Sequence, residues 1–388
     1  NYAVGDKILT KGKDGKYGTY DDGQAITEDE FFTMIKKIID NGHSPFVYTT
    51  NSVEAYTPVI YQGMMAQNMG YENFYNFMAL KGEIKNKSGS AEANITPATG
   101  ADAWTTDVVK NAYQAGLEFY YRTIIGNVGK INGSEYKPAD MLHKSCVNSS
   151  SLTHLEAQDK FISGHYEDVG YSAFLIEGTW WENEAKGTFE NLTPIEDEPR
   201  GFGQREYRYY LYPVTDTQVT ANNKSVMAVQ DDGCGVLFDN ERVYKSLKDG
   251  ITKEAYIQKC KEFLAYTLSD DCLEYYTTST GNPRPFDYEV SAENLAKMTP
   301  FQRNCWAITH DTENVSIVYP NVLNNLCAVR TLGKLNNFKA SESVTTPYGA
   351  LNRNRSTQIT LDAYVDAVYK YVAKNYAGSY NVAKDYIR

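Results

Sequence analysis

The stretch that decides the fold is "FLIEGTWWENEA", residues 174–185. An apolar run ends at a glycine, Trp180 and Trp181 follow side by side, and two carboxylates come next, at Glu182 and Glu184. The chain has only 4 tryptophans in 388 residues. Adjacent side chains point to opposite faces of a strand, or about 100° apart around a helix, so both indoles do not fit easily into one core. We expect one indole in the core, and the other on a ligand or over a contact between domains.

The composition limits the possible partners. A length of 388 residues favours two domains over three. No apolar run approaches the roughly 20 residues of a membrane helix, and 42% hydrophobic residues supply ample core. The net charge of -11 argues against nucleic acid and anionic membranes as partners. The 32 tyrosines offer flat faces with hydroxyl groups, which suit hydrated polar ligands.

The cysteines show no metal-binding spacing. None forms a CxxC motif or a Cys/His cluster of the kind that holds zinc. An even count would allow disulfides in an exported protein, but a chain of this length does not need them, so buried free thiols are favoured. The six are Cys146, Cys234, Cys260, Cys272, Cys305 and Cys327.

The hydrophobic pattern predicts helices that alternate with short strands. Thr27 and Glu30 have capping-box spacing ahead of an amphipathic run, and Gly42 follows that run as a stop. Further helices are expected at 53–69, 104–125, 154–163, 252–268 and 359–378, strands at 44–50, 172–178 and 207–214, and a loop at 81–101. This alternation predicts an α/β architecture with largely parallel strand pairing.

The motifs of common enzyme classes are absent. The sequence has no GxSxG, HExxH, Walker loop or GxGxxG, and its five histidines are scattered. Glu182 and Glu184 stand only two residues apart, whereas a glycosidase needs carboxylates that face each other across the substrate at about 5 to 9.5 Å. A glycan-active enzyme that uses these two glutamates remains an alternative.

The loop "KDGKYGTYDDG", residues 13–23, resembles a calcium loop in part. With Gly15 as the turn glycine, Asp14 and Asp21 take the fifth and twelfth positions of an EF-hand-like loop. Thr10 and Gly12 then occupy positions where carboxylates are expected. A glycine-rich turn with solvated charges is the favoured interpretation, and structural calcium is the alternative. No other cofactor is expected.

The tryptophan pair suits a sugar best. A flat indole covers the C–H face of a sugar ring, and a nearby carboxylate such as Glu182 accepts hydrogen bonds from the hydroxyl groups.

The surroundings of this pair resemble extracellular solute-binding proteins of family 1, the carbohydrate-binding subunits of ABC importers. Residues 154–185 are similar to the family segment in which a helix leads into a strand and an aromatic pair. Residues 15–50, 259–285 and 360–372 resemble other family blocks in the same order. The resemblance extends over essentially the whole chain, and 174–185 and 258–285 are its most specific parts.

The resemblance implies a two-lobe fold of the type II periplasmic-binding-protein kind. Residues 1–212 and 286–388 correspond to a nearly complete C-terminal lobe, and 213–285 to a remnant of the N-terminal lobe with the hinge crossings. The opening strands of the family have no counterpart after Asn1. We therefore expect a C-terminal fragment of a longer protein.

The resemblance also nominates ligand-binding residues. Trp180 and Trp181 occupy the aromatic position at the cleft floor. Glu54 and Tyr56 follow the strand where maltose-binding relatives place cleft residues, and Arg284 lies in a loop that faces the cleft from the smaller lobe. A planar guanidinium suits paired hydroxyl groups.

One departure puts maltodextrin specificity in doubt. Some maltose-binding relatives carry an aromatic pair where this sequence has Leu326 and Cys327, which cannot stack on a sugar. Tyr319 and Trp306 are the alternative candidates for an aromatic side chain that packs on the sugar from this side of the cleft.

The function that the resemblance implies is binding of an oligosaccharide between two lobes and delivery to the permease subunits of an ABC transporter, without catalysis. We expect an exported monomer, extracellular or periplasmic, held at the membrane only through a lipid anchor that this chain lacks. A glycan sensor or adhesion module on the same fold is the remaining alternative.

Overall fold

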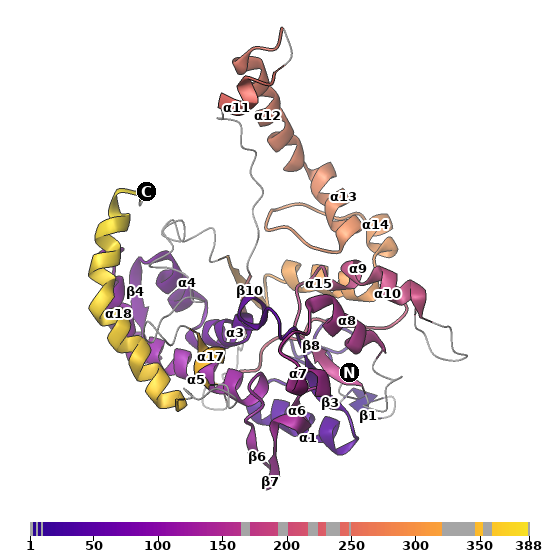
Figure 1. The fold of residues 1–388 in the computed structure, drawn as a ribbon, viewed down its shortest axis with the longest axis vertical. Helices are drawn as coiled ribbons and strands as arrows, with labels where there is room; N and C mark the ends of the chain where they lie inside the picture. Colours follow the sequence, from indigo (N-terminus) through magenta and orange to yellow (C-terminus); the bar gives the residue numbers. More distant parts are fainter. Residues whose placement is uncertain are drawn as a thin grey trace.

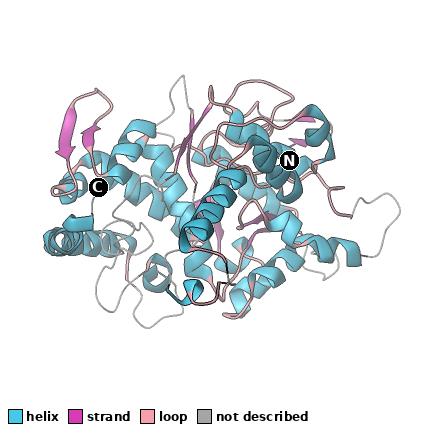
Figure 2. Ribbon diagram, turned by 90° about the horizontal axis from the view of Figure 1, so that it is seen from above, coloured by secondary structure: helices cyan, strands magenta, loops and turns pink. Residues whose placement is uncertain are grey.

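The protein has an α/β fold in which short strands lie among packed helices (Figures 1 and 2). The computed structural model describes residues 3–4, 7–8, 11–163, 171–192, 201–215, 224–229, 241–247, 250–319, 346–351 and 359–386. The predicted mixture of helix and strand is confirmed, but the prediction of largely parallel pairing is wrong: among the described residues, three of the five strand pairs are antiparallel. The two-lobe arrangement, with 213–285 as a separate part, stays a prediction.

A parallel strand pair lies next to the tryptophan segment. β3 (Ser44–Val47) pairs with β8 (Ser172–Leu175), and Phe46 stands opposite Phe174. The helix α1 (Glu28–Asp40) leads into β3, and the predicted capping box between Thr27 and Glu30 is present. The predicted helix before β8 is α8 (His154–Ser163). This pair directs the chain after β8 toward the candidate site.

A second parallel pair joins distant parts of the chain. β9 (Ser225–Ala228) pairs with β10 (Val315–Val318), which follows α15 (Pro300–His310). The Gln67 side chain fixes β9, because its amide donates to the Lys224 carbonyl and accepts from the Val226 N–H.

The main core is built around two helices. The helix predicted at 53–69 is divided before Pro58 into α2 (Val53–Tyr56) and α3 (Pro58–Met69). α3 packs closely against α5 (Asp107–Thr123). A Cβ atom at Gly116 would lie 2.4 Å from the Tyr61 carbonyl oxygen, so only glycine permits this approach.

Two sequence predictions are corrected. The loop expected at 81–101 contains a hairpin of β4 (Gly82–Lys85) and β5 (Ala91–Ile95). Only Ile84 and Ile95 of its strand residues are buried, so the sequence lacks the alternation that predicts strands. The segment 207–214, expected as a strand, is extended but carries only one isolated bridge, between Val214 and Thr27.

The last helix, α18 (Leu361–Ala383), is longer than predicted. Tyr364, Val368 and Val372 are buried as expected, but the helix continues through Gly378, because glycine weakens a helix without necessarily ending it. α17 (Pro347–Leu351) packs against it.

An arm of helices projects from the body at the top of Figure 1. α11 (Glu241–Tyr244) and α12 (Lys253–Thr267) form its tip, and α13 (Asp270–Thr280) and α14 (Ala292–Lys297) connect it to the body. Within α12 only Cys260 is buried.

The remaining elements complete the periphery. They are β1 (Ala3–Val4), β2 (Lys7–Ile8), α4 (Tyr71–Ala79), η1 (Gly100–Thr105), β6 (Gly129–Ile131), β7 (Ser134–Tyr136), α6 (Pro138–Met141), α7 (Lys144–Asn148) and η6 (Lys384–Tyr386). Among the described helices, none has the length and apolar character needed to cross a membrane. Four cysteines are free thiols: Cys146, Cys260, Cys272 and Cys305. Cys234 and Cys327 lie outside the described residues, as does Leu326.

Candidate functional site

The exposed indole of Trp180 is held against a glycine. After β8 the chain turns at Gly178 and enters α9 (Trp181–Glu184) and α10 (Lys186–Asn191). A Cβ atom at Gly178 would lie 2.2 Å from Cη2 of the Trp180 ring, so any larger residue would displace the indole. Trp180 is 42% exposed, whereas Trp104, Trp181 and Trp306 are 5–8% exposed. Of the four tryptophans, Trp180 alone presents its ring to solvent.

Trp181 lies in an aromatic core. Its ring centroid is 5.0 Å from that of Tyr207, 5.5 Å from that of Phe161 and 5.6 Å from that of Phe301, each in an edge-on arrangement. The two neighbours therefore point in different directions, as the sequence predicted, and the structure decides which one is buried.

Glu182 is directed to the same buried side. The side chain is 1% exposed, and its carboxylate accepts a hydrogen bond from the Thr299 hydroxyl group at the start of α15. Burial raises the pKa of Glu182 above its usual value. Glu182 thus lies away from the exposed face of Trp180, where the sequence placed it as a hydroxyl acceptor.

Two other carboxylates lie on the Trp180 side. The amide nitrogen of Gln158 donates to Oε1 of Glu177 at 3.3 Å and to Oε2 of Glu184 at 2.7 Å. Burial, reinforced by the charge of Glu184, raises the pKa of Glu177 to about 7, although hydrogen bonds from the Gly178 N–H and Gln158 oppose the shift. Neither Glu177 nor Gln158 was singled out from the sequence. The sequence feature that could have identified them is their position, because Glu177 precedes the turn glycine and Gln158 lies on the helix before β8.

Tyr56 joins this cluster through His154. The two rings are stacked at 5.9 Å with 15° between their planes, and Nε2 of His154 lies 3.7 Å from Oε1 of Glu184. Desolvation and the charges of Glu177 and Glu184 raise the pKa of Tyr56. Glu54, predicted as its companion, instead accepts a hydrogen bond of 2.5 Å from the Thr346 hydroxyl group.

The loop that carries Arg284 reaches the tryptophan segment. The Thr179 hydroxyl group donates to the Asn282 side chain at 2.5 Å, which places Asn282 beside Thr179. The Arg284 guanidinium lies 5.5 Å from the centroid of the Tyr276 ring. The structure therefore joins the loop that carries Arg284 to Thr179, and joins Tyr56 to Glu184 through His154. Trp306, an alternative candidate for an aromatic side chain of the cleft, is instead buried and stacked on His310.

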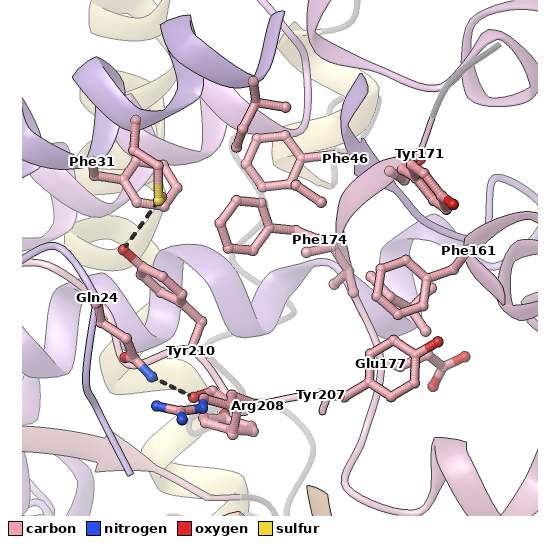
Figure 3. A pocket seen from close by; sticks show the side chains of 18 of the residues that line it. Gln24, Phe31, Phe46, Phe161, Tyr171, Phe174, Glu177, Tyr207, Arg208 and Tyr210 are labelled. Atoms are coloured by element: carbon pink, nitrogen blue, oxygen red, sulfur yellow. Dashed lines mark hydrogen bonds between the residues drawn. The ribbon is translucent and has the colours of Figure 1, made fainter. Parts of the chain in front are cut away.

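A cavity of about 930 Å³ lies between β8 and the segment 205–213 (Figure 3). Its lining includes Glu177 and Trp181, but not Trp180, Tyr56, Glu184 or Arg284. Phe161 and Glu177 lie on one side, and Gln24 and Tyr210 on the other. Aromatic side chains form most of its labelled wall: Phe31, Phe46, Phe161, Phe174, Tyr207 and Tyr210. Glu177 belongs both to this wall and to the carboxylate cluster.

In the predicted calcium loop, the Asp21 carboxylate is occupied by hydrogen bonds from the loop itself. Asp21 accepts from the backbone N–H groups of Lys13 at 2.6 Å and Asp14 at 3.1 Å, and from the Thr19 hydroxyl group at 3.1 Å. A calcium ion would need these oxygens as ligands. Within the described part of the chain, no three His, Cys, Asp or Glu side chains are grouped to share a metal. Thr10 lies outside the described residues, and calcium stays a prediction that this geometry does not favour.

Together these features define an α/β protein with an exposed tryptophan beside a carboxylate cluster. No protein-family profile matches the sequence, and no curated protein matches it. Among solved structures the chain is similar to a chitin oligosaccharide binding protein, with a TM-score of 0.47 and 12% sequence identity. The similarity covers 91% of this chain and 65% of that protein, so the chain spans less than two thirds of the neighbour's length. A likeness this distant leaves the ligand to be inferred from the residues of the chain itself.

Proposed function

We propose that this protein binds an oligosaccharide at the surface formed by Trp180, Tyr56, Glu177 and Glu184, without catalysis. The observation that carries the proposal is the exposed Trp180 indole, fixed on Gly178 and close to hydrogen-bonding carboxylates. An indole packs on the C–H face of a sugar, and carboxylates accept from its hydroxyl groups. In this proposal Trp181 and Glu182 hold the segment in place, and Glu54 has a peripheral role.

We further propose delivery of the sugar to an ABC permease by an exported protein that closes around its ligand. The resemblance of the sequence is the basis for this step. The contact between Thr179 and Asn282 supports it, because it joins the two parts that the sequence divides near residue 213. Arg284 would then approach the ligand from the second part.

A catalytic role for Glu182 and Glu184 has no comparable support. Glu182 bonds to Thr299 on α15, whereas Glu184 bonds to Gln158 on α8, so the two carboxylates point toward different elements. A glycosidase pair must converge on one substrate.

The test is calorimetric titration with a panel of neutral and charged oligosaccharides. Calorimetry is needed because the decisive variant, Trp180→Ala, removes the exposed fluorophore. We expect saturable binding of one glycan class, about tenfold weaker in Trp180→Ala and largely retained in Trp180→Phe, which keeps a flat ring.

Two outcomes would overturn the proposal. Equal affinity of the folded Trp180→Ala variant and the unchanged protein would remove Trp180 from the site. Release of shorter glycans during the titration would show an enzyme instead of a binding protein.

A further inference from the structure

The two carboxylates beside Trp180 share one buried hydrogen-bond donor. Gln158 is 1% exposed, and its amide nitrogen donates to both Glu177 and Glu184, while its Oε1 is buried without a hydrogen-bond partner among the described residues. Two carboxyl side chains are thus held close together by a neutral amide. A neutral donor satisfies their hydrogen bonds but leaves their charge in place.

The described part of the protein supplies no close Lys or Arg partner to these two carboxylates, although Arg205 and Arg208 line the same cavity as Glu177. Among the described residues, no Lys or Arg lies within ion-pair distance of Glu177 or Glu184. The basic group near them is His154, whose Nε2 lies 3.7 Å from Oε1 of Glu184. Like charges at short range repel each other, and burial strengthens the effect. The raised pKa of Glu177, caused first by burial and also by Glu184, agrees with a shortage of cationic partners.

The neighbouring rings suit a cation as well. The negative face of an indole or phenol ring attracts an ammonium group. Trp180 holds its exposed ring against Gly178, the residue that follows Glu177, and Tyr56 stacks on His154, which lies near Glu184. Glu177 also lines the cavity, so the cluster opens toward space that a ligand can enter.

We propose that the sugar bound at this surface is an amino sugar, whose protonated amine lies between Glu177 and Glu184 while its ring packs on Trp180. This inference rests on the proposed function and names its ligand class. An ammonium group offsets one of the two negative charges and donates up to three hydrogen bonds. A hydroxyl group or an acetamide leaves the charge uncompensated.

Binding of the amine should release a proton. The charged and titratable groups near Glu177 are Glu184, His154 and Tyr56, together with those that line the same cavity from the neighbouring segment: Arg205, Glu206, Tyr207 and Arg208. An added positive charge favours the ionised carboxylate and lowers the pKa of Glu177, so below about pH 7 its proton leaves when the amine binds.

The experiment compares glucosamine oligomers with N-acetylglucosamine oligomers of the same length, by calorimetry at pH 6 in two buffers that differ in ionisation enthalpy. We expect roughly tenfold tighter binding of the amine form, because hydrogen bonds to charged groups are the stronger ones. Proton release should accompany the amine form only.

The variants assign the effect to the two carboxylates. Glu177→Gln should abolish proton release, and both Glu177→Gln and Glu184→Gln should reduce the ratio of the two affinities to about one. Glu184 is on the surface, so its variant stays informative if Glu177→Gln disturbs the fold. Glu190→Gln, at an exposed position of α10, removes the same charge and should keep the full ratio.

The failures of the two proposals are distinguishable. Equal or tighter binding of the acetylated oligomer, or an unchanged ratio in both glutamine variants, would overturn the amine inference and leave sugar binding at Trp180 intact. Failure to bind any oligosaccharide of the panel would overturn the proposed function itself.

Discussion

The two sides of the segment from Gly178 to Ala185 differ in what they do, although each contains one tryptophan and at least one glutamate. We call them the outer side and the inner side. The outer side consists of Trp180, Tyr56, His154, Glu177 and Glu184, and the inner side of Trp181, Glu182, Phe161, Phe189, Tyr207, Phe301 and Thr299. On the inner side the indole is enclosed by rings, whereas on the outer side it is exposed. Adjacent identical residues can thus divide between stability and binding.

The largest expected effect separates the two tryptophans. Trp181→Ala should lower the free energy of unfolding by about 3–5 kcal/mol, because it empties the centre of an aromatic cluster. Trp180→Ala should change it by only about 0.5 kcal/mol, as is usual for exposed positions. Urea denaturation followed by circular dichroism measures both. Equal destabilisation by the two substitutions would contradict the assignment of Trp181 to the core and Trp180 to the surface.

An intermediate effect is expected at Thr299. Its hydroxyl group donates to the buried Glu182 carboxylate and accepts from the Gln302 N–H as the cap of α15. Thr299→Val should cost roughly 1–3 kcal/mol, because a buried acceptor loses its donor. Thr299→Ser keeps the hydroxyl group and serves as the control. A loss of similar size in the serine variant would assign the effect to the methyl group, against this account.

A further effect depends on pH and belongs to the outer side. Glu177 has a pKa of about 7 in the folded protein, against an ordinary value of 4.5. The folded protein therefore holds this proton more tightly than the unfolded chain, so the free energy of unfolding should fall as pH rises from about 4.5 to about 7. Glu177→Gln should show a weaker decline over that range in parallel urea titrations. Identical profiles would mean that Glu177 keeps an ordinary pKa.

Much of the local structure followed from the sequence. The capping box of α1, the strands β3 and β8 and the helices α8 and α12 formed where their patterns predicted. Local rules failed where tertiary contacts decide. The β4–β5 hairpin exposes most of both strands, and α18 passes through Gly378. The segment 207–214 has the composition of a strand, yet Gln24 and Asn304 bind its backbone with side chains instead of a ladder.

The sequence by itself determined that Trp180 and Trp181 point apart, because consecutive side chains cannot share one face of a strand or helix. Only the tertiary structure decided which of them is exposed. α15 supplies Phe301 and Thr299 to one side of the segment, and α8 supplies Gln158 and His154 to the other. These partners lie 19 or more residues away along the chain, so no local pattern reveals that Glu182 is buried while Glu177 lines the cavity. The packing of distant helices made one tryptophan of the pair a core residue and left the other exposed.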